Sequence, residues 1–190
     1  MSTVTIASDP LVAKRGITRG QWDVLVDAGL LDGQHVELVE GTVVETTPQG
    51  EQHSYLTAEL THRLVRGVPE PWRVRVQMPL AATGSSEPEP DLAVVRPEGT
   101  SHPTTAELVV EVAVSSQRMD LVHKPGVYAA VGVVQYWVVD LRARVVVVHT
   151  EPGADGYATV RRLPLDTQLS VLGVDVDLAA LLTDPPVGDA

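Results

Sequence analysis

The seven-residue run LVVEVAV, from Leu108 to Val114, is apolar except for one carboxylate at Glu111. A continuous valine-rich run of this length predicts a strand covered on both faces of its sheet. Strand alternation could instead turn Glu111 toward solvent, but its neighbours at i±1 and i±2 are all apolar. Because a buried ionised carboxylate is costly unless it is paired or bound to a metal ion, Glu111 is the first candidate site residue.

Helical and strand patterns alternate along the rest of the chain. They predict helices over 21–28, 53–67, 121–130 and 175–182, a hairpin over 35–48, and strands over 72–78, 91–96, 108–114, 135–140, 144–150 and 157–162. The strand, helix, strand order from Leu108 to Asp140 is long enough for a crossover between parallel strands. We therefore expect an α/β fold, in which helices flank a mixed β-sheet core that follows an N-terminal helix and hairpin.

Length and composition suit one soluble domain. The chain has 190 residues, 44% of them hydrophobic, and we expect a single domain over 18–183 with flexible tails at 1–17 and 184–190. No apolar run approaches the ~20 residues of a membrane span, and residues 1–15 lack the apolar stretch of a secretory signal. The absence of cysteine excludes disulfides and thiol nucleophiles and favours a cytoplasmic location.

The charge of the chain argues against a broad nucleic-acid surface. The formal net charge is -11, whereas phosphate binding usually relies on a basic face. A carboxylate metal site accounts for part of the negative charge. Four arginines, at positions 63, 66, 73 and 75, offer a test: DNA binding gains support if they line the face that holds Asp91, and loses it if they point away.

Asp91 and Lys124 are the next candidates. Asp91 follows Pro90 at the start of a predicted strand, where it either faces a cleft or belongs to an ordinary acidic turn. Mg²⁺ prefers oxygen ligands, often one or two carboxylates, so Asp91 and Glu111 suit such an ion. Lys124 is one of only two lysines. Its ammonium either assists water activation or pairs with Asp120 one helical turn earlier.

Two further residues are weaker candidates. Glu37, between Val36 and Leu38 in the predicted hairpin, is either an additional ligand or an exposed edge residue. His53, near a predicted helix start, is interpreted as a capping or surface residue in preference to a phosphate contact. No phosphate-binding glycine loop, zinc-type histidine spacing or serine triad is recognisable.

The order of these motifs resembles the Uma-two family of endonucleases. The resemblance is carried by ELVEG at 37–41, PDLAVV at 90–95, VEV at 110–112, Lys124 in the following helix, and YWVVD at 136–140. It covers the chain from about Thr18 to His149. The family belongs to the PD-(D/E)XK superfamily, so the resemblance implies a restriction-endonuclease-like fold.

The resemblance also implies a divalent-metal site. Asp91, Glu111 and the backbone carbonyl of Val112 would hold Mg²⁺, or Mn²⁺ in its place, and Glu37 matches a further acidic position. The superfamily lysine usually stands two residues after the glutamate, where this chain has Ala113. In the Uma-like branch that lysine lies in the next helix, as Lys124 does.

We therefore expect a metal-dependent DNA endonuclease, with the likeness implying a homodimer. Two alternatives stay open. One is a catalytically silent dimeric scaffold, favoured by the negative charge and by Pro125 directly after the lysine. The other is a hydrolase of a small phosphorylated substrate, for which acidic surroundings matter less.

Overall fold

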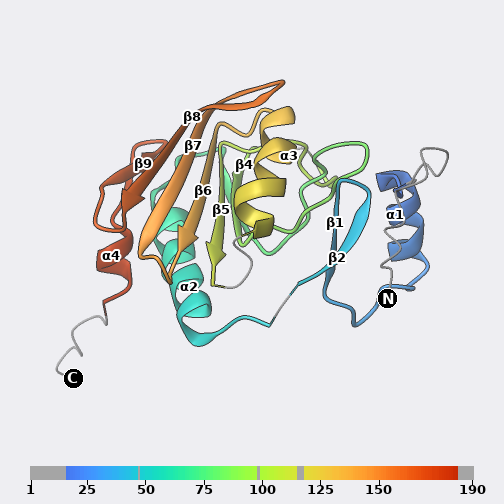
Figure 1. The fold of residues 1–190 in the computed structure, drawn as a ribbon, viewed down its shortest axis with the longest axis horizontal. Coiled ribbons are helices and arrows are strands. Elements are labelled where there is room, and N and C mark those ends of the chain that lie inside the picture. The colour runs from blue at the N-terminus through green and yellow to red at the C-terminus, as the bar shows by residue number, and fades with distance from the viewer. Residues whose placement is uncertain (1–15, 47, 98, 115–117, 184–190) are drawn as a thin grey trace, which may run out of the picture.

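The computed structural model describes residues 16–46, 48–97, 99–114 and 118–183 (Figure 1). The helices are α1 (Arg19–Asp27), α2 (Glu51–Gly67), the π-helical turn η1 (Met119–His123), α3 (Lys124–Ala130) and α4 (Leu178–Leu181). The strands are β1 (Val36–Val39), β2 (Thr42–Glu45), β3 (Arg73–Val76), β4 (Leu92–Val95), β5 (Leu108–Ala113), β6 (Gln135–Asp140), β7 (Val145–Gly153), β8 (Gly156–Pro164), β9 (Leu169–Val171) and β10 (Val174–Val176).

Six strands form one mixed sheet in the order β3-β4-β5-β6-β7-β8. Every neighbouring pair is antiparallel except β5 and β6, which are parallel and are joined through α3. This confirms the crossover predicted between Leu108 and Asp140. It also confirms the predicted α/β class with a mixed sheet at its core.

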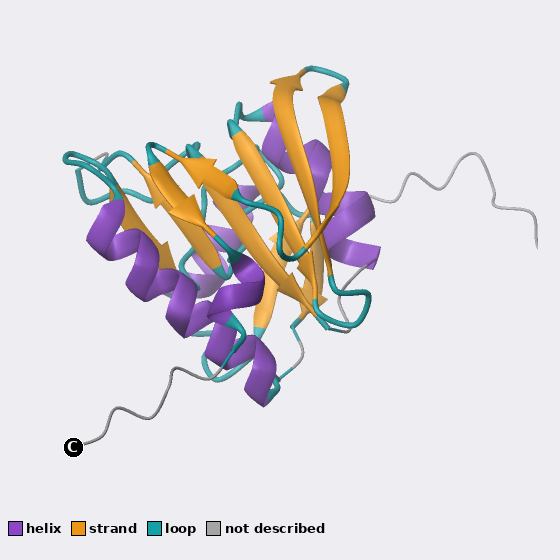
Figure 2. Ribbon diagram, turned by 90° about the vertical axis from the view of Figure 1, so that its left-hand side faces the viewer, coloured by secondary structure: helices purple, strands orange, loops and turns teal. Residues whose placement is uncertain are grey.

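Both faces of the central strands are covered. Alternate residues of β5 point to opposite sides, so Leu108, Val110 and Val112 pack with α2 in one apolar cluster. Val109 and Ala113 belong to a second cluster that includes Tyr128 of α3. Figures 1 and 2 show α2 on one face of the sheet and α3 on the other. Alternation therefore turns Glu111 under α3 and not toward solvent.

The β1-β2 hairpin and α1 lie together at one end of the molecule (Figure 1). The hairpin turns through Glu40 and Gly41, which both have positive φ, at 49° and 76°. Two such residues form the tight turn whose twist matches paired strands. The turn fixes a register that leaves Glu37 buried, only 3% exposed.

The chain before α3 differs from the predicted helix over 121–130. It begins as the π-helical turn η1 at Met119, and α3 itself starts at Lys124. Pro125 lies in the first turn of α3, where its missing N–H breaks no helical hydrogen bond. The proline therefore marks a helix start, and it leaves Lys124 buried at the junction.

The predicted closing helix over 175–182 is wrong in its first part. Val174 and Val176 are buried and Asp175 is exposed, an alternation that belongs to strand β10 paired with β9. The helix begins only after Asp177, whose side chain caps it by accepting a hydrogen bond from the Ala180 N–H. The sequence analysis did not predict β9.

The predicted tails fall mostly on residues 1–15 and 184–190, which lie outside the described residues. Ile17, at the end of the predicted N-terminal tail, donates a backbone hydrogen bond of 2.9 Å to Gly41 in the hairpin turn. No helix in the described part of the chain has the length and apolar character needed to cross a membrane.

Candidate functional site

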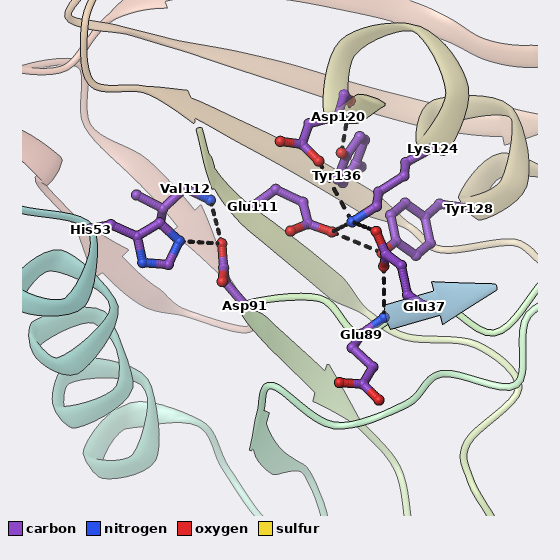
Figure 3. Close-up of polar contacts among 10 residues, drawn as sticks. All are labelled: Glu37, His53, Glu89, Asp91, Glu111, Val112, Asp120, Lys124, Tyr128 and Tyr136. Atoms are coloured by element: carbon purple, nitrogen blue, oxygen red, sulfur yellow. Dashed lines mark hydrogen bonds and ion pairs between the residues drawn. The ribbon is translucent and has the colours of Figure 1, made fainter. Parts of the chain in front are cut away.

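All five predicted site residues line one cavity of about 340 Å³, which also borders the β1-β2 hairpin and the first turns of α2 and α3. They are Glu37, Asp91, Glu111, Val112 and Lys124. The ladder explains why two of them meet: Leu92 of β4 pairs with Val110 of β5, so Asp91 and Glu111 are the next residues outward on adjacent strands. Figure 3 shows these side chains converging.

Lys124 connects the carboxylates of the site. Its Nζ lies 2.9 Å from Oε1 of Glu111 and 3.0 Å from Oε1 of Glu37. It also lies 3.6 Å from Oδ1 of Asp120, four residues earlier. The predicted pairing with Asp120 is therefore present, but it is one of three ion pairs. Each of the four side chains is less than one-tenth exposed.

Asp91 is held from two sides. Its Oδ2 accepts a hydrogen bond of 2.8 Å from the backbone N–H of Val112 and lies 3.0 Å from Nε2 of His53. His53 belongs to the first turn of α2 and is 8% exposed. The prediction of a capping or surface role for His53 is therefore wrong. A helix packed across the sheet places it against the strand ends, which local sequence does not reveal.

Glu37 has contacts on both carboxylate oxygens. Oε1 faces Lys124, and Oε2 accepts a hydrogen bond of 3.1 Å from the backbone N–H of Glu89. The hairpin is also bridged to the acidic loop, where Leu38 pairs with Glu87. Glu37 is thus buried between β1 and the loop that leads to Asp91. The alternative of an exposed edge residue is wrong.

Tyr128 and Tyr136 complete the buried network under α3. The Tyr128 hydroxyl donates to Oε1 of Glu111 at 3.0 Å, and the Tyr136 hydroxyl donates to the Asp120 carbonyl at 2.8 Å. Burial, and then the Glu111 carboxylate, raise the pKa of both phenols well above the ordinary value. Both hydroxyls therefore stay protonated donors. The sequence analysis missed Tyr128, although it lies one helical turn after Lys124.

Negative charge exceeds positive charge inside the site. Burial raises the pKa of Glu111 well above its ordinary value; Lys124 lowers it, while Asp120, Asp91 and Glu37 raise it further. Burial alone would lower the pKa of Lys124, but Glu111, Glu37 and Asp120 raise it above the ordinary lysine value. One ammonium thus faces several carboxylates, and added positive charge would stabilise the arrangement.

The donor chemistry of the site fits a hard divalent cation. Among the described residues, no cluster of three or more His, Asp or Glu side chains has an arrangement that could by itself hold a metal ion. Mg²⁺ nevertheless needs only one or two protein carboxylates, because waters and substrate phosphate supply its other oxygens. Asp91 and Glu111 supply two carboxylates to the wall of one cavity.

Three of the four arginines chosen as a test make contacts away from the site. Arg63 donates to the Asp175 carbonyl at 2.9 Å, Arg73 to Glu70 at 2.5 Å, and Arg75 to the Pro79 carbonyl at 3.3 Å. Arg66 lines a second cavity, which shares Gln49 and Gln77 with the site cavity. Only one of the four therefore adds to the case for DNA binding.

Comparison with known proteins decides the family. The family model Uma2, described as "Putative restriction endonuclease", matches residues 26–182. The chain belongs to the Uma2 family. The match confirms the resemblance carried by the motifs from Glu37 to Asp140, and it places the chain in a nuclease-type family.

A solved structure is similar to this Uma2 chain in fold. It is titled as a putative nuclease belonging to DUF820 from Anabaena variabilis, and the two chains are 18% identical with a TM-score of 0.61. The similarity covers 77% of this chain and 89% of that one. It confirms the predicted restriction-endonuclease-like fold. A search of curated proteins found no match.

Proposed function

We propose that this Uma2 chain is a metal-dependent endonuclease that hydrolyses phosphodiester bonds in DNA. Asp91, Glu111 and the Val112 carbonyl would hold Mg²⁺, or Mn²⁺ in its place, and Glu37 is a further candidate ligand. A divalent cation bound there would neutralise charge on the scissile phosphate and acidify an attacking water.

Lys124 supplies fixed positive charge in this proposal. The carboxylates around it raise its pKa above the ordinary lysine value, so it stays protonated at neutral pH and is a donor, not a base. Its ammonium can donate to a water or to a phosphate oxygen that enters the cavity. Glu37 and Tyr128 hold this arrangement, Glu37 by orienting Lys124 and Tyr128 by donating to Glu111.

One observation carries the proposal: Lys124 Nζ lies 2.9 Å from Glu111 at the same buried strand ends where Asp91 is held by the Val112 N–H. Such a buried set of like charges is unfavourable for folding by itself. It is typical of sites where carboxylates and one ammonium are kept together for chemistry.

The test is cleavage of supercoiled plasmid and short duplex DNA at low salt with Mg²⁺ or Mn²⁺. The parent should cut, EDTA should stop cutting, and Asp91→Ala and Lys124→Ala should each abolish it while remaining folded by circular dichroism. Asp32→Ala, a change at an exposed residue that does not line the cavity, is the matched control. Absence of cutting, together with absence of metal binding by calorimetry, would leave the chain as a silent scaffold.

The negative charge and the distant arginines favour a second candidate, a hydrolase of a small phosphorylated substrate. Such a ligand needs no basic face, because the metal and Lys124 would suffice for one phosphate. A panel of phosphomonoesters and phosphodiesters, assayed for released product beside the plasmid, separates the two activities. Turnover of a small ester without DNA cleavage would select this candidate.

We also propose a homodimer and a cytoplasmic location. A two-fold pair would present two sites to the two strands of a duplex. Light scattering after gel filtration measures the oligomeric state. Fractionation of cells that make a tagged chain tests the location.

A further inference from the structure

A groove of about 570 Å³ runs along α2 beside the candidate metal cavity. Gln49, before α2, and Gln77, after β3, line both cavities. The two spaces are therefore neighbours with a shared wall. A ligand held at Asp91 would reach the groove past Gln49 and Gln77.

One face of α2 forms the long wall of the groove. Ala58, His62 and Val65 line it at helical spacing, and Val76 of β3 faces them. Val65, in the last turn of α2, is 59% exposed and gives the groove an apolar surface. Arg66 also lines the groove. The groove thus combines apolar surface with a single guanidinium.

Thr57 contributes a polar group that lacks a partner. The residue is only 5% exposed and lines the groove, yet its Oγ1 has no hydrogen-bond partner among the described residues. A helical threonine usually bonds a carbonyl one turn earlier. A buried hydroxyl left unpaired costs free energy, and this Oγ1 is itself covered from solvent, so Thr57 is a polar spot in the groove wall and not an exposed contact.

Gln77 sits at the junction in a backbone conformation that non-glycine residues rarely adopt, with φ at 49°. Its backbone N–H lies 3.2 Å from the carbonyls of both Pro90 and Asp91. The chain therefore holds this residue in place against the loop that carries the metal-site carboxylate. Strained residues of this kind cluster where ligands are clamped.

We infer that the α2 groove binds the nucleotide next to the scissile phosphate, on a strand that is not base-paired at that position. This inference rests on the proposed nuclease function. The base and sugar would lie against Ala58, Val65 and Val76, and a flanking phosphate would contact Arg66. The volume is in the range of small-molecule sites. One guanidinium matches one phosphate, and the net charge of -11 disfavours the broad phosphate contact that a fully paired duplex makes with its protein.

Two variants test the groove. Arg66→Ala removes the phosphate contact, and Ala58→Trp fills the groove from an exposed helix position. Arg63→Ala is the matched control, because Arg63 lies on the same helix but does not line the groove. Binding of a fluorescein-labelled 12-nucleotide single strand is measured by anisotropy in Ca²⁺ across a salt series. Cleavage in Mg²⁺ and Mn²⁺ is measured with the same proteins.

We expect Arg66→Ala and Ala58→Trp to weaken single-strand binding at least tenfold, and Arg63→Ala to stay within twofold of the parent. Arg66→Ala should also reduce the slope of log affinity against log salt by about 0.7, the value for one phosphate on a single strand. The fully paired duplex of the same sequence should bind more weakly than the single strand.

The outcomes separate this inference from the proposed function. If the parent cuts DNA but both groove variants bind and cut like the parent, the groove inference is wrong and the nuclease stands. If both variants weaken binding but no protein cuts with either metal, the groove stands and the nuclease proposal is wrong. Tighter binding of the duplex would overturn the unpaired-strand assignment, and a parent that neither binds nor cuts contradicts both.

Discussion

The Nε2 atom of His53 lies 3.0 Å from Oδ2 of Asp91, so the first turn of α2 holds the carboxylate at the start of β4 (Figure 3). The backbone N–H of Val112 donates to the same oxygen. Partners of this kind fix the orientation of a metal-binding carboxylate before the ion arrives. His53 is therefore a positioning residue for Asp91 in the proposed site.

His53→Ala should raise the Mn²⁺ concentration needed for half-maximal cleavage by about 10–100-fold, the usual effect of losing such a partner. His53→Gln should recover part of the loss, because its amide can donate to Asp91. His102→Ala, an exposed histidine outside the cavity, is the control. An unchanged metal requirement in His53→Ala would remove the positioning role.

Lys124→Met should destabilise the fold by about 3–5 kcal/mol at pH 7, since it leaves buried carboxylates without their ammonium. Urea denaturation measures the loss. Adding Glu111→Gln to Lys124→Met should recover part of it, because one uncompensated charge is removed. If the effects of the two changes on the free energy of unfolding are strictly additive, Lys124 and Glu111 do not interact energetically, despite the 2.9 Å between Nζ and Oε1.

The same lysine predicts a loss of stability in alkali. Its pKa is higher in the folded than in the unfolded chain, so its contribution is complete below the ordinary lysine value of about 10.4 and is lost as the pH rises toward the folded value. The urea midpoint of the parent should fall above that pH more steeply than the midpoint of Lys124→Met. Parallel curves for the two proteins would count against this.

Metal binding should stabilise the parent. At a Mg²⁺ concentration 100 times the dissociation constant, binding adds about 2.7 kcal/mol, which corresponds to a rise of roughly 5–10 °C in melting temperature for a chain of this size. Asp91→Asn should lose this shift while keeping the fold. Asp32→Asn should behave like the parent, and a shift of equal size in Asp91→Asn would place the ion elsewhere.

His149 predicts a loss of stability in acid, away from the site. Burial lowers the pKa of His149, and the hydrogen bond between its Nδ1 and the Tyr136 carbonyl raises it by a smaller amount. The unfolded chain therefore holds the proton more tightly, and stability falls as the pH drops below about 6.5 toward the folded value. His149→Phe should cost about 0.5–1.5 kcal/mol at pH 8, yet lose less stability than the parent between pH 7 and 5. Thermal melts across that range measure both, and equal acid losses would refute the assignment.

The sequence predicted much of the central sheet and the residues that meet in one cavity. Valine-rich runs around Glu111 and after Gln135 read correctly as covered strands, because residues with both faces buried leave a continuous apolar signal. Asp91 and Lys124 could be picked out as candidate site residues for a similar reason. Asp91 is a charged residue beside an apolar segment, and Lys124 is one of only two lysines in the chain. The strand over 174–176 could not be predicted in this way, because three residues next to a helix cap are too few to show the alternation of a strand.

The sequence by itself determined which chemical groups exist and which strands carry them. The tertiary structure alone decided that His53 reaches Asp91, that Tyr128 donates to Glu111, and that Arg63 donates to the Asp175 carbonyl, away from the site. Local pattern reports the period and burial of a segment, but not which remote segment packs against it. The packing of α2 and α3 on opposite faces of the sheet made these contacts, because side chains far apart in sequence meet only where the sheet order and the helix orientation bring them together.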